Sequence, residues 1–405
     1  MKHVIVIGGG ASGMAAAVTA ASGGVSVTVL EKKEQLGKKL QVTGNGHCNF
    51  SNSDLKPADY HCDDAGFLAS FLEAHPTQKA CAILEELGLL SHEKNGYWYP
   101  LSDQASSVVQ AFKNRLKDLQ VEVRLQADVK KVIKDPEGGF RVFLEQETLH
   151  ADAVLLSCGS MASVRDRQPF AGYRFLEDLG LPVVPAAPAL VPLYGNDGCE
   201  LFWDGVRMTC TVSLPSGQTQ TGEVQFTKKG ISGIPVFQLS HEAAAMIRER
   251  GSCLVRIDFM PGYSAEDLQQ LFTRWADRRL DRVLSGMLPS KIGPVVSKKA
   301  GLTASGKVSA MTSAETERLL KALKSFEYEA KGYGSMEDAQ VSSGGLPLSQ
   351  VSEQFEVRAV PGLYVTGELL NVDGICGGYN LHFALMSGMA AGEALAGMAP
   401  EGGAV

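Results

Sequence analysis

The stretch that decides the fold is Val4-Ile-Val-Ile-Gly-Gly-Gly-Ala-Ser-Gly13, near the start of a 405-residue chain. Its four apolar residues predict a buried strand of a parallel sheet, and the Ala-rich run that follows Gly13 predicts a helix. A second β-branched run over 25–30 comes after a pair of glycines and ends at Glu31. Strand, helix and strand within about thirty residues form a right-handed β-α-β unit, so a parallel sheet is expected.

The glycines of this turn fit the pattern G-x-G-x-x-G, and each has its own physical role. Gly8 permits a tight turn, Gly10 lets the backbone approach a pyrophosphate, and Gly13 lets the helix pack closely on the strand. The helix N-terminus then presents free N–H groups and a positive dipole to phosphate. Glu31 is placed to accept both ribose hydroxyls of an ADP moiety. The alternative, a glycine-rich turn in an unrelated α/β protein, does not explain the acid.

The dinucleotide bound at this turn is either NAD or FAD, and three distal segments favour FAD. Residues 44–49 are small or polar and suit a chain that passes along the pyrophosphate, although alone they also fit a surface turn. Gly367-Glu368 ends a late strand, where flavoproteins of this type place an acid for the ribityl hydroxyls. Residues 374–380 precede the last helix, whose N-terminus can face the flavin pyrimidine edge. An NAD-only Rossmann domain needs none of these segments.

Composition restricts the partners of the chain. Lys and Arg number 38 and Asp and Glu 45, which gives a net charge of -7. This balance, without an Arg-rich or aromatic–basic cluster in the sequence pattern, predicts no binding of nucleic acid or of a membrane surface. The expected partner is a small-molecule substrate, and the oligomeric state stays open.

The sequence also predicts a cytoplasmic protein without a metal site. Its first apolar run is broken by glycine after four residues, which fits a buried strand better than a secretion signal. No uncharged apolar stretch is long enough to cross a membrane. The 8 cysteines show neither CxxC pairs nor metal-ligand spacing with His, so we expect reduced thiols and no bound metal.

Changes in pattern along the chain predict its domains. A Pro-rich stretch near 181–188 marks a boundary. We expect a first part of the nucleotide-binding domain at 1–187, a β-rich insert at 188–260, a helical insert at 261–342 and the second part of the nucleotide-binding domain at 343–405.

Local patterns add expected elements to this plan. Residues 65–119 are mostly helical in pattern, and residues 121–158 are typical of a meander of strands. In the helical insert, Ser264 with Asp267 and Thr312 with Glu315 have capping-box spacing.

The sequence resembles the bacterial family of FAD-binding NAD(P)/FAD-dependent oxidoreductases, which includes aminoacetone-oxidase-type and bile-acid 4,6-reductase-type members. The matching stretches occur in order along nearly the whole chain: 4–13, 37–49, 226–233, 341–345 and 362–380. The resemblance implies an α/β fold, with a glutathione-reductase-type FAD-binding Rossmann domain that carries inserted β-barrel-like and helical domains.

The motifs and the resemblance together predict a set of FAD-binding residues at the turns and strand ends of the split domain. These residues are Gly8, Gly10, Ala11, Ser12, Gly13, Glu31, Lys32, Lys39, Gly44, Asn45, Gly46, His47, Cys48, Asn49, Val129, Cys158, Gly159, Gly367, Glu368, Gly377, Gly378, Tyr379 and Asn380. His47 replaces the arginine of the family's Gly-Gly-Gly-Arg-Cys-Asn, so the contact made by that guanidinium is in doubt here.

For the other candidate residues, a structural role is favoured over a redox or substrate-binding role. Cys48 and Cys376 could form a redox pair, but Ser53 stands where disulfide reductases carry their second cysteine, and packing is the better interpretation. Five residues could line a substrate pocket, although each fits a structural role better: Trp203, Arg207, His241, Tyr333 and His382. The catalytic acid or base is not identified by the sequence.

We therefore expect an FAD-dependent oxidoreductase that transfers hydride through flavin N5 to a conjugated small molecule. No second glycine fingerprint is present, so NADH or NADPH would dock transiently as the electron donor. One alternative is oxidation of an amine or aminoketone with dioxygen. Another is an FAD-dependent RNA-modifying protein, which the acidic net charge disfavours, and a third is a flavin-binding regulator without turnover.

Overall fold

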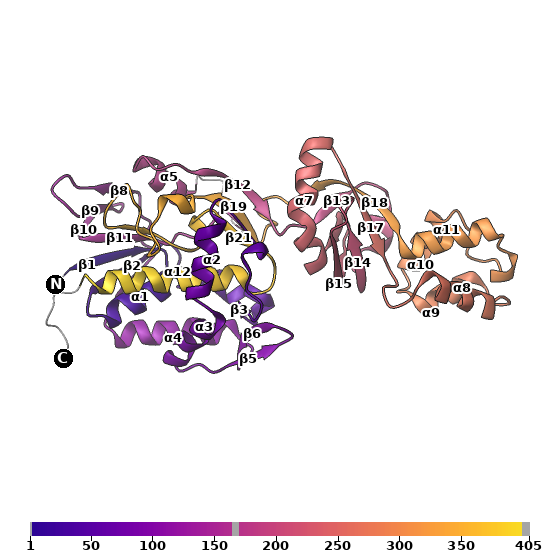
Figure 1. The fold of residues 1–405 in the computed structure, drawn as a ribbon, viewed down its shortest axis with the longest axis horizontal. Coiled ribbons are helices and arrows are strands. Elements are labelled where there is room, and N and C mark those ends of the chain that lie inside the picture. Colours follow the sequence, from indigo (N-terminus) through magenta and orange to yellow (C-terminus); the bar gives the residue numbers. More distant parts are fainter. Residues whose placement is uncertain (1, 164–169, 399–405) are drawn as a thin grey trace. The chain divides into compact units, whose positions relative to one another are not determined.

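The computed structural model describes residues 2–163 and 170–398, and the chain divides into two compact units (Figure 1). The first unit joins both ends of the chain, Met1–Ala187 and Val341–Val405, and the second is the continuous segment Pro188–Gln340. Each unit has its own buried apolar cluster. The first unit therefore combines segments from both ends of the chain.

A five-stranded parallel sheet lies at the centre of the first unit, with strand order β20-β11-β1-β2-β7. Its strands are β1 (His3–Ile7), β2 (Ser26–Glu31), β7 (Glu122–Leu125), β11 (Ala153–Leu156) and β20 (Leu363–Val365). The strand β20 comes from the C-terminal part of the chain and pairs in parallel with β11. One sheet thus contains strands from both ends of the sequence, and the expected α/β Rossmann fold is confirmed.

The first and last helices pack directly on each other, as Figure 1 shows. These helices are α1 (Ala11–Ser22) and α12 (Tyr379–Ala396), and α1 also contacts α4 (Ala105–Asp118). Two glycines of α12 make the close approach possible. A Cβ atom at Gly388 would lie 2.2 Å from the carbonyl oxygen of Ser12, and one at Gly392 would lie 2.7 Å from that of Ala16.

The remaining elements of the first unit are short. The strands form small sheets in the orders β10-β9-β8, β3-β6-β5, β21-β4 and β12-β19. Their bounds are β3 (Ser51–Asn52), β4 (Tyr60–Cys62), β5 (Ser91–Lys94), β6 (Tyr97–Pro100), β8 (Lys131–Lys134), β9 (Phe140–Phe143), β10 (Thr148–Ala151), β12 (Val184–Ala189), β19 (Val341–Gly345) and β21 (Val372–Gly374). The helices are α2 (Ala65–Ala74), α3 (Thr77–Glu86) and α5 (Ala171–Asp178), with the 3-10 turns η1 (Leu40–Gly46), η2 (Pro57–Asp59), η4 (Leu348–Gln350) and η5 (Gly367–Leu369).

Two expectations for this unit are corrected. The run expected to be mostly helical, 65–119, is interrupted by the hairpin of β5 and β6, which turns at Asn95-Gly96 with positive φ at both residues. The strands over 121–158 do not form one meander. Their outer members, β7 and β11, join the parallel sheet, whereas β8, β9 and β10 form an antiparallel sheet of their own.

The second unit is built on a closed barrel of six strands in the order β13-β16-β15-β14-β17-β18. Its strands are β13 (Leu193–Gly195), β14 (Arg207–Ser213), β15 (Thr219–Phe226), β16 (Gly230–Ser232), β17 (Cys253–Asp258) and β18 (Phe326–Tyr333). Antiparallel pairing of β18 with β13 closes the barrel, which leaves no free sheet edge. The inserted barrel expected from the sequence is confirmed.

Helices complete the second unit: α6 (Glu200–Trp203), α7 (Ile234–Arg250), α8 (Ala265–Arg274), α9 (Leu280–Met287), α10 (Ile292–Lys299) and α11 (Ser313–Lys324), with the turn η3 (Val308–Ala310). Both predicted capping boxes are present, at the starts of α8 and α11. The expected division at 260/261 differs from the structure, because the long helix α7 lies in the β-rich range and β18 lies in the helical range. Burial alternates along β18, the period of a strand.

None of the helices described in the structure combines the length and the apolar character needed to cross a membrane.

Candidate functional site

The turn between β1 and α1 has the geometry that its glycines predict. Gly8 has φ +110°, and a Cβ there would lie 2.3 Å from the carbonyl oxygen of Ser157. A Cβ at Gly13 would lie 2.0 Å from the oxygen of Gly8, so helix and strand meet without room for a side chain. The hydroxyl of Ser157 donates to the oxygen of Gly8 at 2.8 Å and fixes the turn against β11.

Gly10 differs from its neighbours because the space beside it is open. A Cβ at Gly10 would find no atom within 4 Å, in contrast to one at Gly13. Gly10 is the N-cap of α1, no side chain caps that helix end, and the first turn carries no acidic residue. The backbone at Ala11 and Ser12 can therefore present its N–H groups to a phosphate that approaches beside Gly10.

Glu31 lies at the end of β2 and is oriented by backbone donors. One carboxylate oxygen accepts the N–H of Gly9 and the other accepts the N–H of Lys33, both at 2.7 Å. Each oxygen keeps a further lone pair, so the carboxylate can still accept the two hydroxyls of a ribose. The neighbouring Lys32 points to Asp128, with its ammonium 3.6 Å from that carboxylate.

The predicted segment 44–49 reaches the N-terminus of α12. Its backbone is left-handed at Gly44, Asn45 and Cys48, and φ is also positive at Gly46, so the chain turns sharply. The side-chain nitrogen of Asn49 donates to the carbonyl oxygen of Ser51 at 2.8 Å. The side-chain oxygen of Asn49 accepts the N–H of Gly378 at 3.3 Å. Two segments more than three hundred residues apart in the sequence are thus in direct contact.

Gly367 and Glu368 lie beside the start of α1. A Cβ at Gly367 would lie 2.7 Å from the hydroxyl of Ser12, and the Gly367 N–H donates to the Ser387 hydroxyl at 3.0 Å. The carboxylate of Glu368 pairs with the ammonium of Lys39 at 2.7 Å and accepts the hydroxyl of Ser160 at 3.3 Å. Lys39 and Glu368, predicted separately, are therefore partners.

The loop before α12 uses its own side chains to hold its shape. Gly377 and Gly378 have positive φ, and the oxygen of Gly377 accepts the amide of Asn52 at 2.9 Å. Asn380 bonds Gly374 in both directions, accepting its N–H and donating to its oxygen. The hydroxyl of Tyr379 donates to the oxygen of Asp54. The Tyr379 and Asn380 side chains are thus engaged in hydrogen bonds within the protein.

The other predicted residues occupy varied environments. His47 is exposed, with Nδ1 3.0 Å from the oxygen of Asp103, so its ring lies against the 101–104 turn. Val129 is buried. Cys158 follows β11, and Gly159 has φ +75° with no atom within 4 Å of a Cβ position, which leaves a second open approach at the sheet edge.

The cysteines near the site are thiols rather than a redox pair. Cys48 and Cys376 are both buried. Burial raises the pKa of each thiol to about 12, and the same effect, with the charge of Glu31, raises that of Cys158 to about 12. A thiol with such a pKa carries almost no thiolate at neutral pH and is a poor nucleophile.

Three of the five candidate pocket residues have structural roles. Trp203 is fully buried in the barrel core against Phe226, and Arg207 pairs with Glu223 at 3.5 Å on the barrel surface. His382 is fully buried, with Nδ1 2.9 Å from the hydroxyl of Ser51. These three are structural. His241 lies on α7 and Tyr333 at the end of β18.

The residues that meet at the carboxyl edge of the sheet fit an ADP-containing flavin cofactor. Open space beside Gly10, an uncapped helix end, a carboxylate with free lone pairs and the glycine-lined start of α12 are the features such a ligand needs. The fold and this site define a Rossmann-type flavoprotein oxidoreductase. The chain belongs to the HI0933-like protein Rossmann domain family, whose profile matches residues 2–394.

Individual relatives agree with this assignment. The chain is similar to the 3-dehydro-bile acid delta(4,6)-reductase of Clostridium scindens, with 35% identity over 98% of this chain and 99% of that protein. It is also similar to the ribosomal RNA dihydrouridine synthase of Haemophilus influenzae, with 26% identity over 95% and 96% of the two chains. The solved 3-ketosteroid delta1-dehydrogenase of Sterolibacterium denitrificans shares the fold, with a TM-score of 0.55, 15% identity and coverage of 98% and 100%.

Sequence reasoning missed several residues that shape the site. Ser51 and Asn52 hold the start of α12, and Ser157 and Ser160 anchor Gly8 and Glu368. Ser51 and Asn52 follow the predicted 44–49 segment directly, which is the one signal that could have indicated them. The serines at 157 and 160 carry no pattern of their own.

Proposed function

We propose that this protein uses bound FAD to reduce a carbon–carbon double bond conjugated to a carbonyl in a small ring compound, with NADH or NADPH as the electron donor. The observation that carries the proposal is the similarity, over almost the whole length of both chains, to a reductase of ring double bonds. The more distant relatives support the same reaction class, because dihydrouridine is uridine with one conjugated ring double bond saturated.

The proposed reaction adds one hydride and one proton across the double bond. NADH or NADPH supplies the hydride and becomes oxidised, solvent or an acidic side chain supplies the proton, and the β carbon of the conjugated system accepts the hydride. When bound, FAD relays the hydride through its N5 atom. The protein would hold the ADP part with Glu31 and the N-terminus of α1, and the ribityl part with Glu368 and Lys39.

The N-terminus of α12 is the proposed electrostatic contribution of the protein. Its N-cap is Gly378, no side chain caps this helix end, and its first turn contains no acidic residue. The positive end of an eighteen-residue helix there would favour negative charge on a ligand beside it.

Anaerobic stopped-flow absorbance tests the proposal. We expect NADH or NADPH to bleach the flavin absorbance without substrate, and a conjugated cyclic ketone to restore it with formation of the saturated ketone. Bleaching only by an amine or aminoketone, followed by peroxide formation on admission of air, would contradict the proposal and support the oxidase alternative.

An RNA substrate is a second candidate, because one part of the second unit is basic. Residues 274–307 contain only Asp277 and Asp281 as acids, and their basic side chains are all exposed: Arg274, Arg278, Arg279, Arg282, Lys291, Lys298, Lys299 and Lys307. The guanidinium of Arg278 also lies 5.8 Å from the ring centroid of Trp275. Exposed basic side chains beside an aromatic ring are a feature of surfaces that bind phosphate backbones, and this supports the candidate.

A gel shift with ribosomal RNA fragments at several salt concentrations tests this candidate. If RNA is the substrate, Arg278→Ala with Arg282→Ala should weaken binding about tenfold and reduce its salt dependence. The matched pair Arg248→Ala with Arg250→Ala, at the end of α7, removes the same charge outside the basic stretch and should have little effect. Equal losses in both pairs, or no salt-sensitive shift at all, would exclude RNA.

A further inference from the structure

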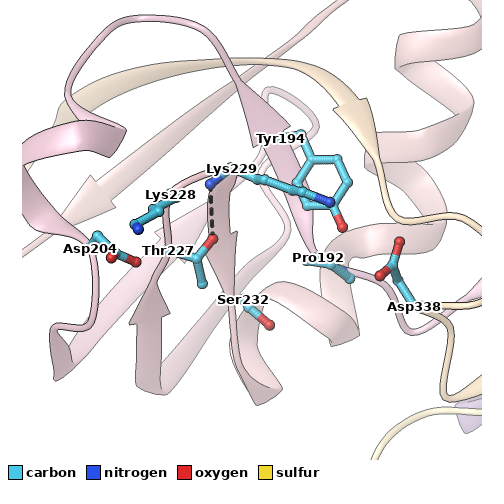
Figure 2. A pocket seen from close by; sticks show the side chains of 8 residues that line it. All are labelled: Pro192, Tyr194, Asp204, Thr227, Lys228, Lys229, Ser232 and Asp338. Carbon is cyan, nitrogen blue, oxygen red and sulfur yellow. Dashed lines mark hydrogen bonds between the residues drawn. The ribbon is translucent and has the colours of Figure 1, made fainter.

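A hollow in the second unit contains a motif that the flavin site does not use. Its volume is about 390 Å³, and Figure 2 shows the side chains that line it. They are Pro192, Tyr194, Asp204, Thr227, Lys228, Lys229, Ser232 and Asp338. Thr227, the two lysines and Ser232 belong to the stretch 226–233, which the sequence analysis singled out and to which no role has been given.

The lysine loop between β15 and β16 is held in one conformation. The Thr227 hydroxyl accepts the N–H of Lys229 at 3.3 Å, which is the dashed line in Figure 2. It also accepts the N–H of Gly230 at 3.2 Å. A Cβ at Gly230 would lie 2.1 Å from the oxygen of Leu193, so the loop presses on the barrel wall and only glycine fits there. Both lysine side chains are exposed, and hydrogen bonds to Thr227 hold the backbone that carries them. Little ordering of the backbone would be needed to bind a ligand.

The charges in the hollow are only partly neutralised. The Asp338 carboxylate already accepts the N–H and the hydroxyl of Ser335, each at 3.0 Å. The Lys229 ammonium lies 5.5 Å from the Tyr194 ring centroid. Across residues 2–163 and 170–398, neither Lys228 nor Lys229 has a carboxylate within 4.0 Å. Both ammonium groups are therefore available to an anion.

The lining of the hollow also contains hydroxyl and carboxylate groups. Ser232 ends β16, and the seventeen-residue helix α7 begins just after it, without a capping side chain or an acid in its first turn. Asp204 is half-buried and brings a carboxylate to the same lining. A ligand that combines an oxyanion with hydroxyl donors would satisfy both the lysines and the aspartate, whereas a simple anion would meet Asp204 as a like charge.

We propose that this hollow binds the phosphate and ribose of a nucleotide, with Lys228 and Lys229 on the phosphate and Asp204 on the ribose hydroxyls. The further statement that the nucleotide is the NADH or NADPH of the reaction rests on the proposed function. The chain lacks a second glycine fingerprint, so a donor nucleotide needs a binding surface of another kind, and this hollow offers one.

Calorimetric titration of the flavin-loaded protein with adenosine 2′,5′-bisphosphate tests the site without redox chemistry. We expect saturable one-to-one binding that weakens about tenfold to hundredfold in Lys228→Ala with Lys229→Ala. The control is Lys298→Ala with Lys299→Ala, an adjacent exposed lysine pair on α10 outside the hollow. Titration with inorganic phosphate and with adenosine should each give weaker binding than the bisphosphate. Flavin content and circular dichroism establish that each variant is folded.

The outcomes separate this site from the proposed function. Bisphosphate binding that is unchanged in the Lys228/Lys229 variant, or equally reduced in the Lys298/Lys299 control, overturns the site. If NADPH reduces the flavin in both lysine variants with the same KM, the nucleotide in the hollow is not the donor. If the bisphosphate binds through Lys228 and Lys229 but neither NADH nor NADPH bleaches the flavin, the site stands and the proposed function fails.

Discussion

Gly10 and Gly13 show that the same residue type can serve two physical purposes within one turn. A side chain at Gly13 would collide with the backbone of Gly8, whereas one at Gly10 would meet open space. Gly13 therefore serves the fold, and Gly10 serves a ligand that the turn is shaped to admit.

Replacing Gly10 separates these purposes. The variant Gly10→Ala should fold with an almost unchanged free energy of unfolding, because no protein atom is displaced. It should bind FAD at least about tenfold more weakly, since the added methyl group occupies the approach of the pyrophosphate. Flavin fluorescence titration of the apoprotein measures this loss.

The control for that experiment is Gly262→Ala, another glycine with open space around its Cβ position, in the second unit. It should leave both stability and FAD affinity as they are. If Gly10→Ala binds FAD as tightly as the Gly262 variant does, the pyrophosphate does not lie beside Gly10.

His382 makes the stability of the first unit depend on pH. Burial lowers the pKa of this imidazole to about 4, from an ordinary value near 6.5, while Nε2 lies 2.9 Å from the oxygen of His75. Between these pKa values the unfolded chain binds a proton that the folded chain does not. Stability is therefore lost as the pH falls, by about 2 kcal/mol from pH 7 to pH 5 for this group.

Urea unfolding of wild type and His382→Gln at both pH values isolates this contribution. Glutamine keeps a donor and an acceptor but does not titrate, so the variant should lose about 2 kcal/mol less on acidification. An identical pH dependence in the two proteins would show that His382 is not the group responsible.

At the scale of elements, the contact between α1 and α12 holds the two ends of the chain together. Gly388 has no room for a methyl group, because Ser12 contributes backbone at 2.2 Å. We expect Gly388→Ala to destabilise the protein by about 1–3 kcal/mol through forced separation of the helices. The free energy of unfolding in urea measures the effect.

Gly286 provides the matched helical control. It lies in α9, and a Cβ there would find nothing within 4 Å. Gly286→Ala should be neutral or stabilise by up to about 1 kcal/mol, since alanine is the better helix former. If both variants are equally stable, the tight packing of α12 on α1 is not a source of stability.

Comparison of particular elements shows what the sequence could predict. The β1-α1-β2 unit, Glu31 and both capping boxes follow from local patterns of a few residues, and local physics suffices for them. The hairpin at Asn95-Gly96 was missed although this dipeptide is a strong hairpin signal, because the surrounding helical pattern was extended across it.

Other features depend on contacts that no local pattern encodes. β18 is recognisable as a strand from its alternation, yet its place between β17 and β13 exists only in the closed barrel. The Lys39–Glu368 pair and the contact of Asn49 with Gly378 join distant segments. Resemblance to a family predicted that these segments share a site, but not which atoms meet.

At the scale of the whole molecule, each of the two units carries one of the two proposed ligand sites. The first unit carries every residue predicted for FAD, and the second carries the hollow with Lys228 and Lys229. Hydrogen exchange should therefore respond to the two ligands in different places.

Addition of FAD to the apoprotein should raise amide protection at 8–13, 44–49 and 367–380, while adenosine 2′,5′-bisphosphate should protect 227–233. Groups that contact a ligand open less often when it is bound. Protection by FAD confined to the barrel, or by the bisphosphate confined to the Rossmann unit, would reverse the assignment of the two ligands.

The most direct measurement of the central claim is the flavin content of the purified protein. Absorbance spectra before and after denaturation, with chromatography of the released cofactor, should give about one FAD per chain and a clearly lower FAD content in the Gly10→Ala protein after extensive dilution and buffer exchange. A colourless protein that takes up no added FAD, or equal flavin content in both proteins, would contradict the account that both ends of the chain fold around this cofactor.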